Sequence, residues 1–420
     1  MRSAWTRYLT IQEFKRNGSA ILSGVNYAHV VAIHLYDGSL RGLAKRLVFS
    51  LFMSLRPTTT GNRDRDILVF FANRRKQRAD YDFIAGELRR VVGRDGDYVE
   101  VLEHFNPLQW VSTLAGLLDA LRAVSAYSVN PAERLTTALL IARYYSSRRH
   151  LAAVLSGKRT LVTFCDALPV ENMLTQIART NGAFTLTAQH GQYRLLDQSN
   201  MSPDAEAYAN FISDRMLCWG DATRAEFVRA GFEPNRFIVT GWIRPPRSQQ
   251  EQSGKRPDFF GVMLNGPNAN ESNKALLSVA KAVAAATGIP YLVRLHPQTA
   301  LAAIQPLVDE QCRSIAHIAL EPYLSSVAFS LGHMSGAVVE VLHEGHPTYL
   351  FDDGRLADVF RVEGLSYRSV DELIAAIRAD IVDTSEVRER MASLSAWYND
   401  NTNQASRLRA AILNKQGSHA

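Results

Sequence analysis

The chain contains very little cysteine, and its cysteines are not spaced to hold a metal or to form a disulfide framework. Cys165, Cys218 and Cys312 are the three cysteines among 420 residues, and no CxxC pair occurs. An odd number of widely separated cysteines argues against a structural zinc site and indicates a protein of a reducing compartment.

Long apolar runs are also missing. No segment approaches the ~18 consecutive apolar residues of a membrane-spanning helix. The first residues, MRSAWTRYLTIQEFKRNG, lack the apolar stretch that precedes the cleavage site of a secretory signal. We therefore expect a cytoplasmic protein.

One segment near the N-terminus combines positive charge with large apolar residues. Residues 41–56, RGLAKRLVFSLFMSLR, predict a cationic amphipathic helix. Such a helix lies either in the membrane interface or against the core of its own domain. We expect core packing, with peripheral contact with the inner membrane as the alternative. The Thr- and Gly-containing stretch at residues 58–62 predicts a loop.

Metal-binding patterns and long basic tracts are absent as well. The eleven histidines show no HxxxH or HxH spacing, and the closest pair, His343 and His346, is expected at the surface. Two DxD triplets, at residues 64–66 and 95–97, lie in polar loops rather than at strand ends, so we expect no metal and no other cofactor. The net charge of +6 suits a phosphate-bearing substrate or an anionic membrane surface, and without a Lys/Arg tract it indicates no nucleic-acid partner.

What the chain does contain is a regular alternation of short apolar runs with helical patterns. This alternation predicts an α/β fold with parallel sheets, and a chain of this length predicts two domains. A polar, proline-containing stretch at residues 244–258 predicts the linker between them. We expect an N-terminal domain with a helical start over residues 1–245, a second domain over 246–385, and C-terminal helices over 386–420.

Most of the expected elements lie in these two domains. Strands are expected at residues 67–72, 98–105, 161–164, 184–188, 216–220, 237–241, 259–264, 291–295, 315–319, 327–331 and 348–351. Helices are expected at residues 83–92, 110–124, 132–155, 171–181, 222–230, 274–287 and 337–344, with a further helix capped at its start by Ser369.

The stretch VAFSLGHMSGAVVEVLHEGHPTYLFDD, residues 327–353, predicts a strand, a tight loop, a short helix and a second strand. Ser335 and Gly336 open the predicted helix, where free backbone N–H groups and a hydroxyl can bind an anion such as phosphate. Glu340 follows about one turn later and can accept hydrogen bonds from ribose hydroxyls. Gly345 and Pro347 end the helix.

This pattern resembles the donor-nucleotide signature of GT-B glycosyltransferases and of the related sugar-nucleotide epimerases. The resemblance implies that Ser335 and Gly336 approach the donor phosphates and that Glu340 holds the ribose. It also implies two Rossmann-like domains facing each other across a cleft, with C-terminal helices that often cross back to the first domain. The alternative is an ordinary βαβ turn with an N-cap serine and a solvated glutamate.

Other residues with chemical potential in the second domain also follow predicted strands. Asn265 ends the first strand, and His296-Pro297 follows the strand that contains Arg294. Ligands in such sheets bind at the carboxyl ends of the strands. The His-Pro pair resembles the HP motif of bacterial sialyltransferases and similar sequences in Kdo and polyol-phosphate transferases, which implies that His296 contacts phosphate. Without that role, His296 caps a strand end and Arg294 is a surface residue.

His190 is the candidate general base. It follows a predicted strand in AQHGQYR, between Gln189 and Gly191. A histidine titrates near neutral pH and can take the proton of an acceptor hydroxyl, and Gly191 permits a close backbone turn. A structural histidine at a strand end is the alternative. Asp166 is the second candidate for the base, and a helix N-cap is its alternative role.

The resemblance therefore points to an inverting, metal-independent glycosyltransferase of bacterial capsule or lipopolysaccharide synthesis. It implies a CMP- or CDP-linked donor and a cell-surface glycan or lipid-linked glycan acceptor. Polymerising sialyltransferases carry an acidic pair before glycine in the first domain, whereas this chain has Asp352-Asp353-Gly354 in the second. We interpret that triplet as a turn or a donor-side contact. A sugar-nucleotide 2-epimerase of the same fold and a non-catalytic binding protein in glycan assembly are the alternatives.

Overall fold

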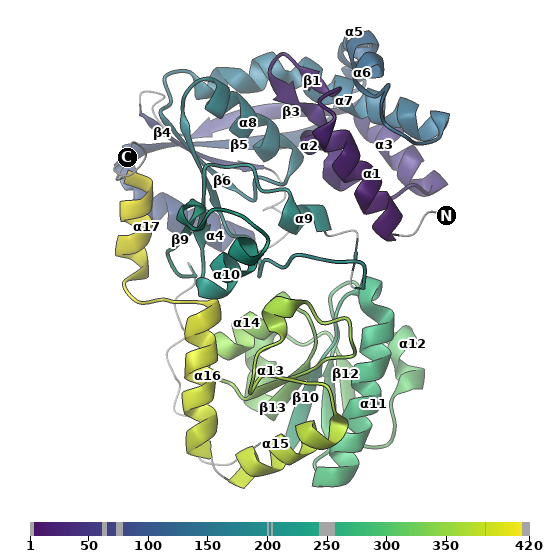
Figure 1. Cartoon of the computed structure of the whole chain (residues 1–420), viewed down its shortest axis with the longest axis vertical. Coiled ribbons are helices and arrows are strands. Elements are labelled where there is room, and N and C mark those ends of the chain that lie inside the picture. Colours follow the sequence, from purple (N-terminus) through teal and green to yellow (C-terminus); the bar gives the residue numbers. More distant parts are fainter. Residues whose placement is uncertain are drawn as a thin grey trace.

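The fold consists of two β-sheets, one in each half of the chain, with helices around both (Figure 1). The computed structural model describes residues 4–60, 65–72, 79–199, 201–202, 205–242, 257–382 and 384–413. The linker at 244–256 and the expected domain boundary at 245/246 lie outside these residues. No described helix is long and apolar enough to cross a membrane.

The N-terminal half contains a seven-stranded sheet. Its first edge strand is antiparallel to its neighbour, and the other neighbouring strands are parallel. The strands lie in the order β3 (Met53–Thr60), β5 (Gly96–Phe105), β4 (Ile67–Ala72), β6 (Thr160–Phe164), β7 (Phe184–Ala188), β8 (Arg215–Cys218) and β9 (Phe237–Val239).

The strands in the middle of this sheet are apolar because both of their faces are buried. Successive side chains of β4 point to opposite faces. Leu68 and Phe70 join the core that contains the long helix α7 (Pro131–Ala152) and α8 (Pro169–Thr180). Val69 joins the core on the other face with α4 (Ala79–Val92). The sheet is thus covered on both sides, as a parallel sheet requires.

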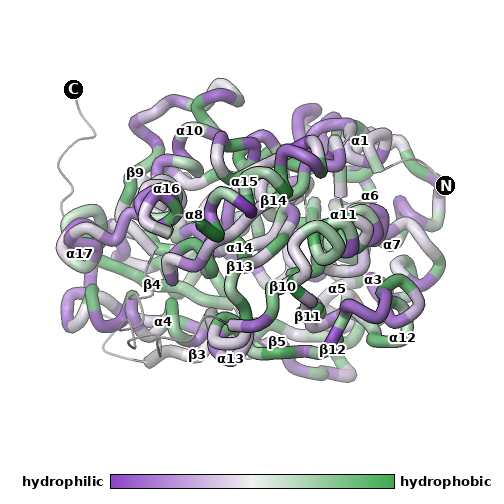
Figure 2. The backbone as a smooth tube through the Cα atoms, turned by 90° about the horizontal axis from the view of Figure 1, so that it is seen from below, coloured by the Kyte–Doolittle hydropathy of each residue, from purple (hydrophilic) through white to green (hydrophobic). Residues whose placement is uncertain are grey.

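The C-terminal half contains a six-stranded sheet that is parallel throughout. Figure 2 shows the central strands largely in the colour of apolar residues, inside more polar helices. The strands lie in the order β12 (Cys312–Ala316), β11 (Tyr291–Arg294), β10 (Phe259–Met263), β13 (Val327–Gly332), β14 (Thr348–Phe351) and β15 (Ser366–Tyr367).

The remaining elements are mainly helices. The N-terminal half also has α1 (Ala4–Arg16), a hairpin of β1 (Ile21–Leu22) and β2 (Val25–Asn26), α2 (Tyr27–Val31), α3 (Leu40–Phe52), α5 (Gln109–Ala115), α6 (Leu117–Ala123), α9 (Ala205–Ala209) and α10 (Asp221–Arg229). The C-terminal half has α11 (Asn270–Thr287), α12 (Leu301–Ile304), α13 (Leu320–Ser326), α14 (Gly336–His343), α15 (Val370–Val382), α16 (Thr384–Tyr398) and α17 (Gln404–Leu413).

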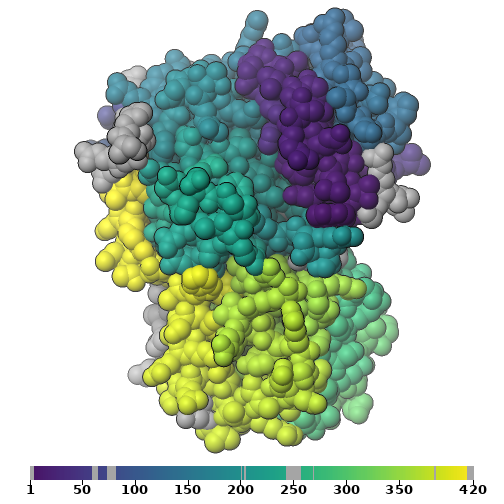
Figure 3. Space-filling model, in the orientation of Figure 1, coloured from purple at the N-terminus to yellow at the C-terminus, as the bar shows by residue number. Residues whose placement is uncertain are grey.

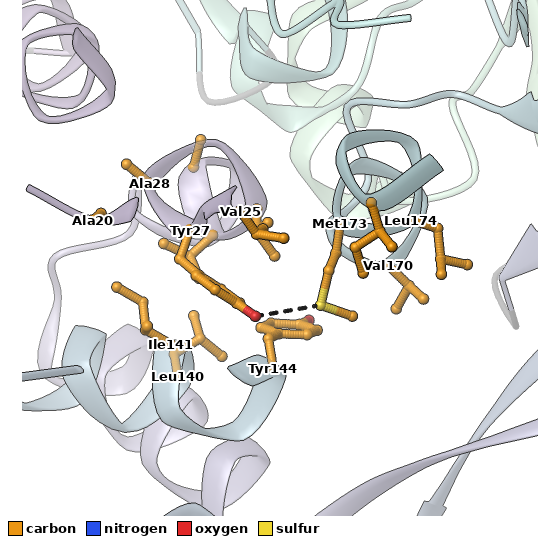
Figure 4. Close-up of a cluster of buried hydrophobic side chains, with 14 of the residues drawn as sticks. Ala20, Val25, Tyr27, Ala28, Leu140, Ile141, Tyr144, Val170, Met173 and Leu174 are labelled. Carbon is orange, nitrogen blue, oxygen red and sulfur yellow. Dashed lines mark hydrogen bonds between the residues drawn. The ribbon is translucent and has the colours of Figure 1, made fainter. Parts of the chain in front are cut away.

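The first helical segment is part of the N-terminal core. Figure 4 shows Val25 and Tyr27 packed between helices α7 and α8. The Tyr27 hydroxyl lies 3.9 Å from the sulfur of Met173 on α8, and Tyr144 of α7 lies below the contact. These buried contacts fix the N-terminal segment to the sheet domain, in agreement with the expected helical start of this domain.

Several predictions for the N-terminal half are wrong in detail. The helix expected at 41–56 ends at Phe52, and the chain continues as β3, which also includes residues 58–60 of the expected loop. The helix expected at 110–124 is two helices, α5 and α6, which break at Gly116. A Cβ at Gly116 would lie 3.2 Å from the Tyr145 ring, so this position is close to α7.

The strands of the C-terminal half follow the prediction more closely. The strand expected at 315–319 is β12, which ends at Ala316, so that prediction is shifted by three residues. The end of α14 follows the expected pattern: Gly345 has a left-handed φ of 68°, and the N–H groups of Gly345 and His346 bond the carbonyls of Leu342 and Val341. This is the Schellman arrangement.

The C-terminal helices cross from one half to the other, as the resemblance implies (Figure 1). α16 packs on α14 of the C-terminal half, and α17 packs on α4 of the N-terminal half. The chain between them passes directly over Gly220, where an added Cβ would lie 2.4 Å from the Trp397 carbonyl oxygen. Glycine is required there because the approaching atoms are backbone.

Candidate functional site

Polar residues follow four neighbouring strands of the six-stranded sheet. Asn265 follows β10, His296 follows β11, His333 follows β13 and Asp353 follows β14. These strands are adjacent and parallel, in the order β11-β10-β13-β14. Their carboxyl ends therefore meet at one edge of the sheet, where ligands of such sheets bind.

The start of α14 lies at this edge and offers backbone donors. Ser335 is the N-cap, and its hydroxyl accepts the N–H of Ala337 at 3.2 Å. Gly336 is the first helical residue, and an added Cβ there would meet nothing within 4 Å. The first turn of a helix has N–H groups without intrahelical partners, which suit an anion. Glu340 is half-buried, one turn further along.

A buried hydrogen-bond network fixes the loop before α14. His333 is 1% exposed, and its Nε2 lies 2.9 Å from Asp353 Oδ1. The hydroxyl of Ser272 donates to Asp353 Oδ2 at 2.6 Å. Burial works to raise the pKa of Asp353, but the bonds from His333 and Ser272 outweigh it and hold the pKa well below its usual value. Asp353 thus remains a charged anchor for the loop.

The sequence analysis did not assign a role to His333. It interpreted Asp352-Asp353-Gly354 as a turn or a donor-side contact, and the structure shows a φ of 88° at Gly354. Asp352 accepts hydrogen bonds from Arg361 at 2.9 Å and Arg368 at 3.0 Å. The signal for His333 was its place in a glycine-bounded loop, but its acidic partner is distant in the sequence.

Hydrogen bonds to its backbone fix the position of Asn265, and its side-chain oxygen can accept a further hydrogen bond. Asn273 of α11 accepts the Asn265 N–H at 2.9 Å and donates to the Asn265 carbonyl at 3.1 Å. Asn265 is 6% exposed, and its Nδ2 lies 3.4 Å from His333 Nδ1. Its Oδ1 has no hydrogen-bond partner within the described part of the chain, which leaves an acceptor at the site.

His296 is oriented so that one ring nitrogen is a donor. Its Nδ1 accepts the N–H of Gln298 at 3.2 Å, so a neutral ring carries its hydrogen on Nε2. The ring lies beside Gly266, where an added Cβ would be 3.3 Å from it. Pro297 follows in a trans peptide. Arg294 bonds the Ile318 carbonyl at 2.9 Å instead, so the structure directs it toward the loop after β12.

The carboxyl edge of the seven-stranded sheet contains His190, directly after β7. Its Nδ1 lies 3.2 Å from the Tyr193 hydroxyl, and its Nε2 lies 3.8 Å from the sulfur of Cys165. The ring stacks on Tyr208 at 5.7 Å. Cys165 has a left-handed φ of 59°, an uncommon backbone conformation for this residue type. A Cβ added at Gly191 would have no other atom within 4 Å.

Asp166 and Gln189 connect neighbouring segments of this sheet. Asp166 is fully buried, and its Oδ2 accepts the N–H groups of Ile212 and Ser213 at 2.9 and 2.6 Å. Burial raises its pKa against the effect of these bonds. Gln189 accepts the N–H of Trp219 at 2.8 Å. The expected N-cap role of Asp166 is wrong, since α8 begins after Leu168. Its part in catalysis stays a prediction, and the geometry favours an anchor.

The two sheet edges are joined by direct contacts between the halves (Figure 3). Arg194, four residues after His190, donates to the Met334 carbonyl in the loop before α14 at 3.3 Å. Arg229 pairs with Asp358 at 2.5 Å. The segment that begins with His190 therefore reaches the loop before α14 in the other half.

The expected surface positions of two histidines are wrong. His346 is 6% exposed, and burial lowers its pKa to about 4. His343 is half-buried, and its Nδ1 lies 3.0 Å from the Asn399 side chain. Among the residues that the structure describes, no group of three or more His, Cys, Asp or Glu is placed to hold a metal ion.

Comparison with known proteins places this arrangement among solved folds. No protein-family model matches the chain, and no curated protein matches it. A UDP-GlcNAc 2-epimerase from Neisseria meningitidis, bound to UDP-GlcNAc, aligns at TM-score 0.50 and 12% identity over 83% of this chain and 100% of that one. The chain has the GT-B fold.

Two further solved structures are similar to the chain. A Listeria monocytogenes protein assigned as a UDP-N-acetylglucosamine 2-epimerase aligns at TM-score 0.51 and 12% identity, over 83% of this chain and 96% of that chain. The glycotransferase of kitacinnamycin aligns at TM-score 0.47 and 12% identity, over 83% and 97%. At this identity the likeness establishes the fold alone, and the resemblance to sialyl-, Kdo- and polyol-phosphate transferases stays a prediction.

Proposed function

We propose that the chain is a glycosyltransferase that moves a sugar from a nucleotide-linked donor to a glycan acceptor. The observation that carries the proposal is the convergence at one point between the halves. Four strand ends of the C-terminal sheet place polar groups around the start of α14. The segment after His190 reaches the same loop through Arg194.

The donor phosphates fit the start of α14. The Gly336 N–H, the Ser335 hydroxyl and the open space at Gly336 accommodate oxygen anions. The Nε2–H of His296 donates to a phosphate oxygen, and Arg194 adds a positive charge beside the loop. Glu340 accepts hydrogen bonds from the ribose hydroxyls.

The transfer itself requires one proton acceptor. The acceptor hydroxyl attacks the anomeric carbon, the bond from that carbon to the phosphate oxygen breaks, and the nucleotide leaves with the electron pair, which inverts the configuration. His190 takes the hydroxyl proton. This role requires the tautomer in which Nδ1–H donates to the Tyr193 hydroxyl, which leaves the lone pair on Nε2.

The alternative is a sugar-nucleotide 2-epimerase, the activity in the name of a solved protein of this fold. An epimerase needs several acidic groups around the sugar ring. The acidic groups at these strand ends bond other residues: Asp352 bonds two arginines, and Asp353 bonds His333 and Ser272. Asp166 accepts two backbone N–H groups through Oδ2, and its Oδ1 has no hydrogen-bond partner among the described residues. This favours transfer with an imidazole base.

We place the proposed enzyme in the cytoplasm, acting on a lipid-linked precursor of capsule or lipopolysaccharide at the inner membrane. The net charge of +6 suits both an anionic donor and an anionic membrane surface. A CMP- or CDP-linked donor is the specific expectation, since the His296-Pro297 pair resembles the motif of transferases that use such donors.

The deciding experiment is thermal unfolding of the purified protein with CMP, CDP, UMP, UDP, GDP or dTDP. A ligand that binds only the native state adds about 2.7 kcal/mol at 100 times its Kd. A shift with CMP or CDP supports the proposal. If UDP-sugar without an acceptor becomes its epimer, the epimerase is correct. No shift with any nucleotide favours the non-catalytic binding protein.

A further inference from the structure

Exposed apolar side chains are concentrated on three short helices of the N-terminal half. α3, α5, α6 and the segment 105–108 carry ten of the seventeen large apolar side chains that are exposed in the described part of the chain. Leu40 and Leu118 reach 86% and 71% exposure. α3 packs on α5 and α5 on α6. These side chains form one surface, called here the apolar face.

The sidedness of α5 is the reverse of that of an ordinary surface helix. It buries Gln109 and Thr113, which are one turn apart, and exposes Trp110, Val111 and Leu114. The Gln109 amide donates to the Thr113 hydroxyl at 3.3 Å. A helix on a water-soluble domain turns its apolar stripe to the core. The exposed apolar side of α5 is therefore better suited to contact with an apolar partner than with water.

α3 shows the same reversal. It buries Arg46 and Ser50 and exposes Leu47 and Val48. The Thr113 hydroxyl of α5 donates to the Ser50 carbonyl at 2.8 Å, which joins the inward polar sides of the two helices. Rotating either helix to bury its apolar residues would break this buried bond, so the reversal is fixed by the fold.

The chain around the apolar face is cationic. Residues 40–56 contain four Lys or Arg and no acidic residue, and residues 104–123 add one Arg and one Asp. Arg46 is buried, so four basic residues and one acidic residue remain outside the core, a net charge of +3. Arg41, Lys45 and Arg56 are exposed, so positive charge is available to an anionic partner.

We propose that the apolar face is a docking surface for an anionic phospholipid bilayer. Tryptophan and leucine side chains enter the interface, while the arginine and lysine side chains meet the headgroups. α5 and α6 have 7 residues each and α3 has 13, so they lie in the membrane plane, because spanning takes about 20 residues. A second copy of the chain fits less well, since a two-fold contact would bring the cationic border against itself.

This surface also explains why the pattern of residues 41–56 predicted only part of the arrangement of α3. The helix does pack on its own domain, through Phe49 and the buried polar residues Arg46 and Ser50, while Leu47 and Val48 remain exposed. Docking would hold the enzyme beside a lipid-linked acceptor, and only that consequence rests on the proposed function. The nucleotide thermal shift tests the donor site separately.

The test is flotation of the full-length protein with vesicles of phosphatidylglycerol and phosphatidylcholine, or of phosphatidylcholine alone. The wild type is expected to float with the anionic vesicles and to be released by high salt. Leu114→Gln/Leu118→Gln should weaken binding about tenfold or more. The matched control Leu301→Gln/Val382→Gln changes exposed residues of the C-terminal half and should float like the wild type.

The charge is tested by a second pair of variants. Arg41→Gln/Lys45→Gln should lower binding to the anionic vesicles by roughly tenfold or more. Arg94→Gln/Arg313→Gln removes two exposed cations elsewhere and should leave binding unchanged. Because all these side chains are exposed, the thermal midpoint without vesicles should stay at the wild-type value in every variant.

Trp110 reports the depth of contact. Brominated lipids should quench the fluorescence of the wild type, and Trp110→Phe should lose this quenching while it still floats. Absence of flotation with both vesicle types overturns the proposal, as does equal flotation of the Leu114/Leu118 variant and its control. So does a dimer in light scattering that the Leu114/Leu118 variant converts to a monomer. A wild type that floats without any nucleotide shift would contradict the proposed function alone.

Discussion

The carboxyl edges of the two sheets use polar residues in different ways. In the C-terminal half, His333 and Ser272 both bond Asp353 and hold the loop that precedes α14. In the N-terminal half, Asp166 and Gln189 bond the backbone of neighbouring segments and tie the sheet together. One edge therefore has a loop fixed by side-chain hydrogen bonds, and the other has side chains that bond the backbone of neighbouring segments.

This difference between the two edges suits the halves to separate roles in the proposed reaction, anion binding in one and proton removal in the other. Anion binding needs several fixed dipoles at one point, which a helix start and converging strand ends supply. Proton removal needs one group with a pKa near neutrality. His190 is the half-buried imidazole of the N-terminal edge, and it lies in the segment that contacts the opposite loop.

The largest expected effect comes from the N-terminal edge. His190→Ala should lower turnover by about 10²–10⁴-fold, because it removes the proton acceptor, while the nucleotide thermal shift stays unchanged. His150→Ala, at an exposed position on α7, is the control. Full turnover of His190→Ala would show that His190 is not the general base and would leave the N-terminal edge with a structural role alone.

The next effect compares two buried histidines, one in each half. Burial lowers the pKa of His29 and of His346 to about 4, whereas an unfolded histidine titrates near ~6.5. The unfolded state therefore gains protons first, and stability present above pH ~6.5 falls as the pH drops toward 4.

A shift of this size corresponds to about 3 kcal/mol per histidine at the acid end. His346→Phe should flatten the acid limb of the unfolding curve, measured as the thermal midpoint between pH 7 and 4. His29→Phe should do the same from the other half. His150→Phe is the control, and an acid limb unchanged by His346→Phe would contradict the assigned burial effect.

A smaller effect tests the crossing between the halves. Gly220→Ala places a methyl group against the backbone of residues 397–399 and should destabilise the protein by about 1–3 kcal/mol. Gly86→Ala is the matched control, because nothing lies within 4 Å of its added Cβ inside α4. It should be neutral or stabilising by up to ~1 kcal/mol. Equal urea-unfolding midpoints for Gly220→Ala and Gly86→Ala would show that the backbone of residues 397–399 moves to accommodate the methyl group.

The smallest effect concerns the loop before α14. Asp353→Asn removes the charge that holds His333 and should weaken nucleotide binding about tenfold, equivalent to ~1.4 kcal/mol, as measured by titration calorimetry. Asp371→Asn, on the exposed first turn of α15, is the control. Unchanged nucleotide affinity in Asp353→Asn would show that nucleotide binding does not depend on the charge of Asp353 beside His333.

The sequence predicted the fold better than the site. Apolar runs such as Ile67–Ala72 became buried strands because a doubly covered sheet leaves them no polar side. Ser335 and Gly345 mark the ends of α14 as expected, since capping is local chemistry. His333 was missed because its partners, Asn265 and Asp353, are distant in the sequence.

The amphipathic helices show where pattern alone fails. The alternation in residues 41–56 and 110–124 predicts a helical apolar stripe, but it does not say whether that stripe faces the core. In the structure the Thr113 hydroxyl bonds the Ser50 carbonyl between the two helices, and only the packing of α3 on α5 creates that bond.

By itself, the sequence determined the alternation of strands and helices, the two halves and the start of α14 at Ser335 and Gly336. These follow from short-range terms, namely side-chain periodicity, caps and turn residues. The tertiary structure decided which polar residues meet, which of them are used up as anchors, and which side of α3 and α5 faces outward. Those outcomes depend on contacts between residues far apart in the chain, and no local pattern records them.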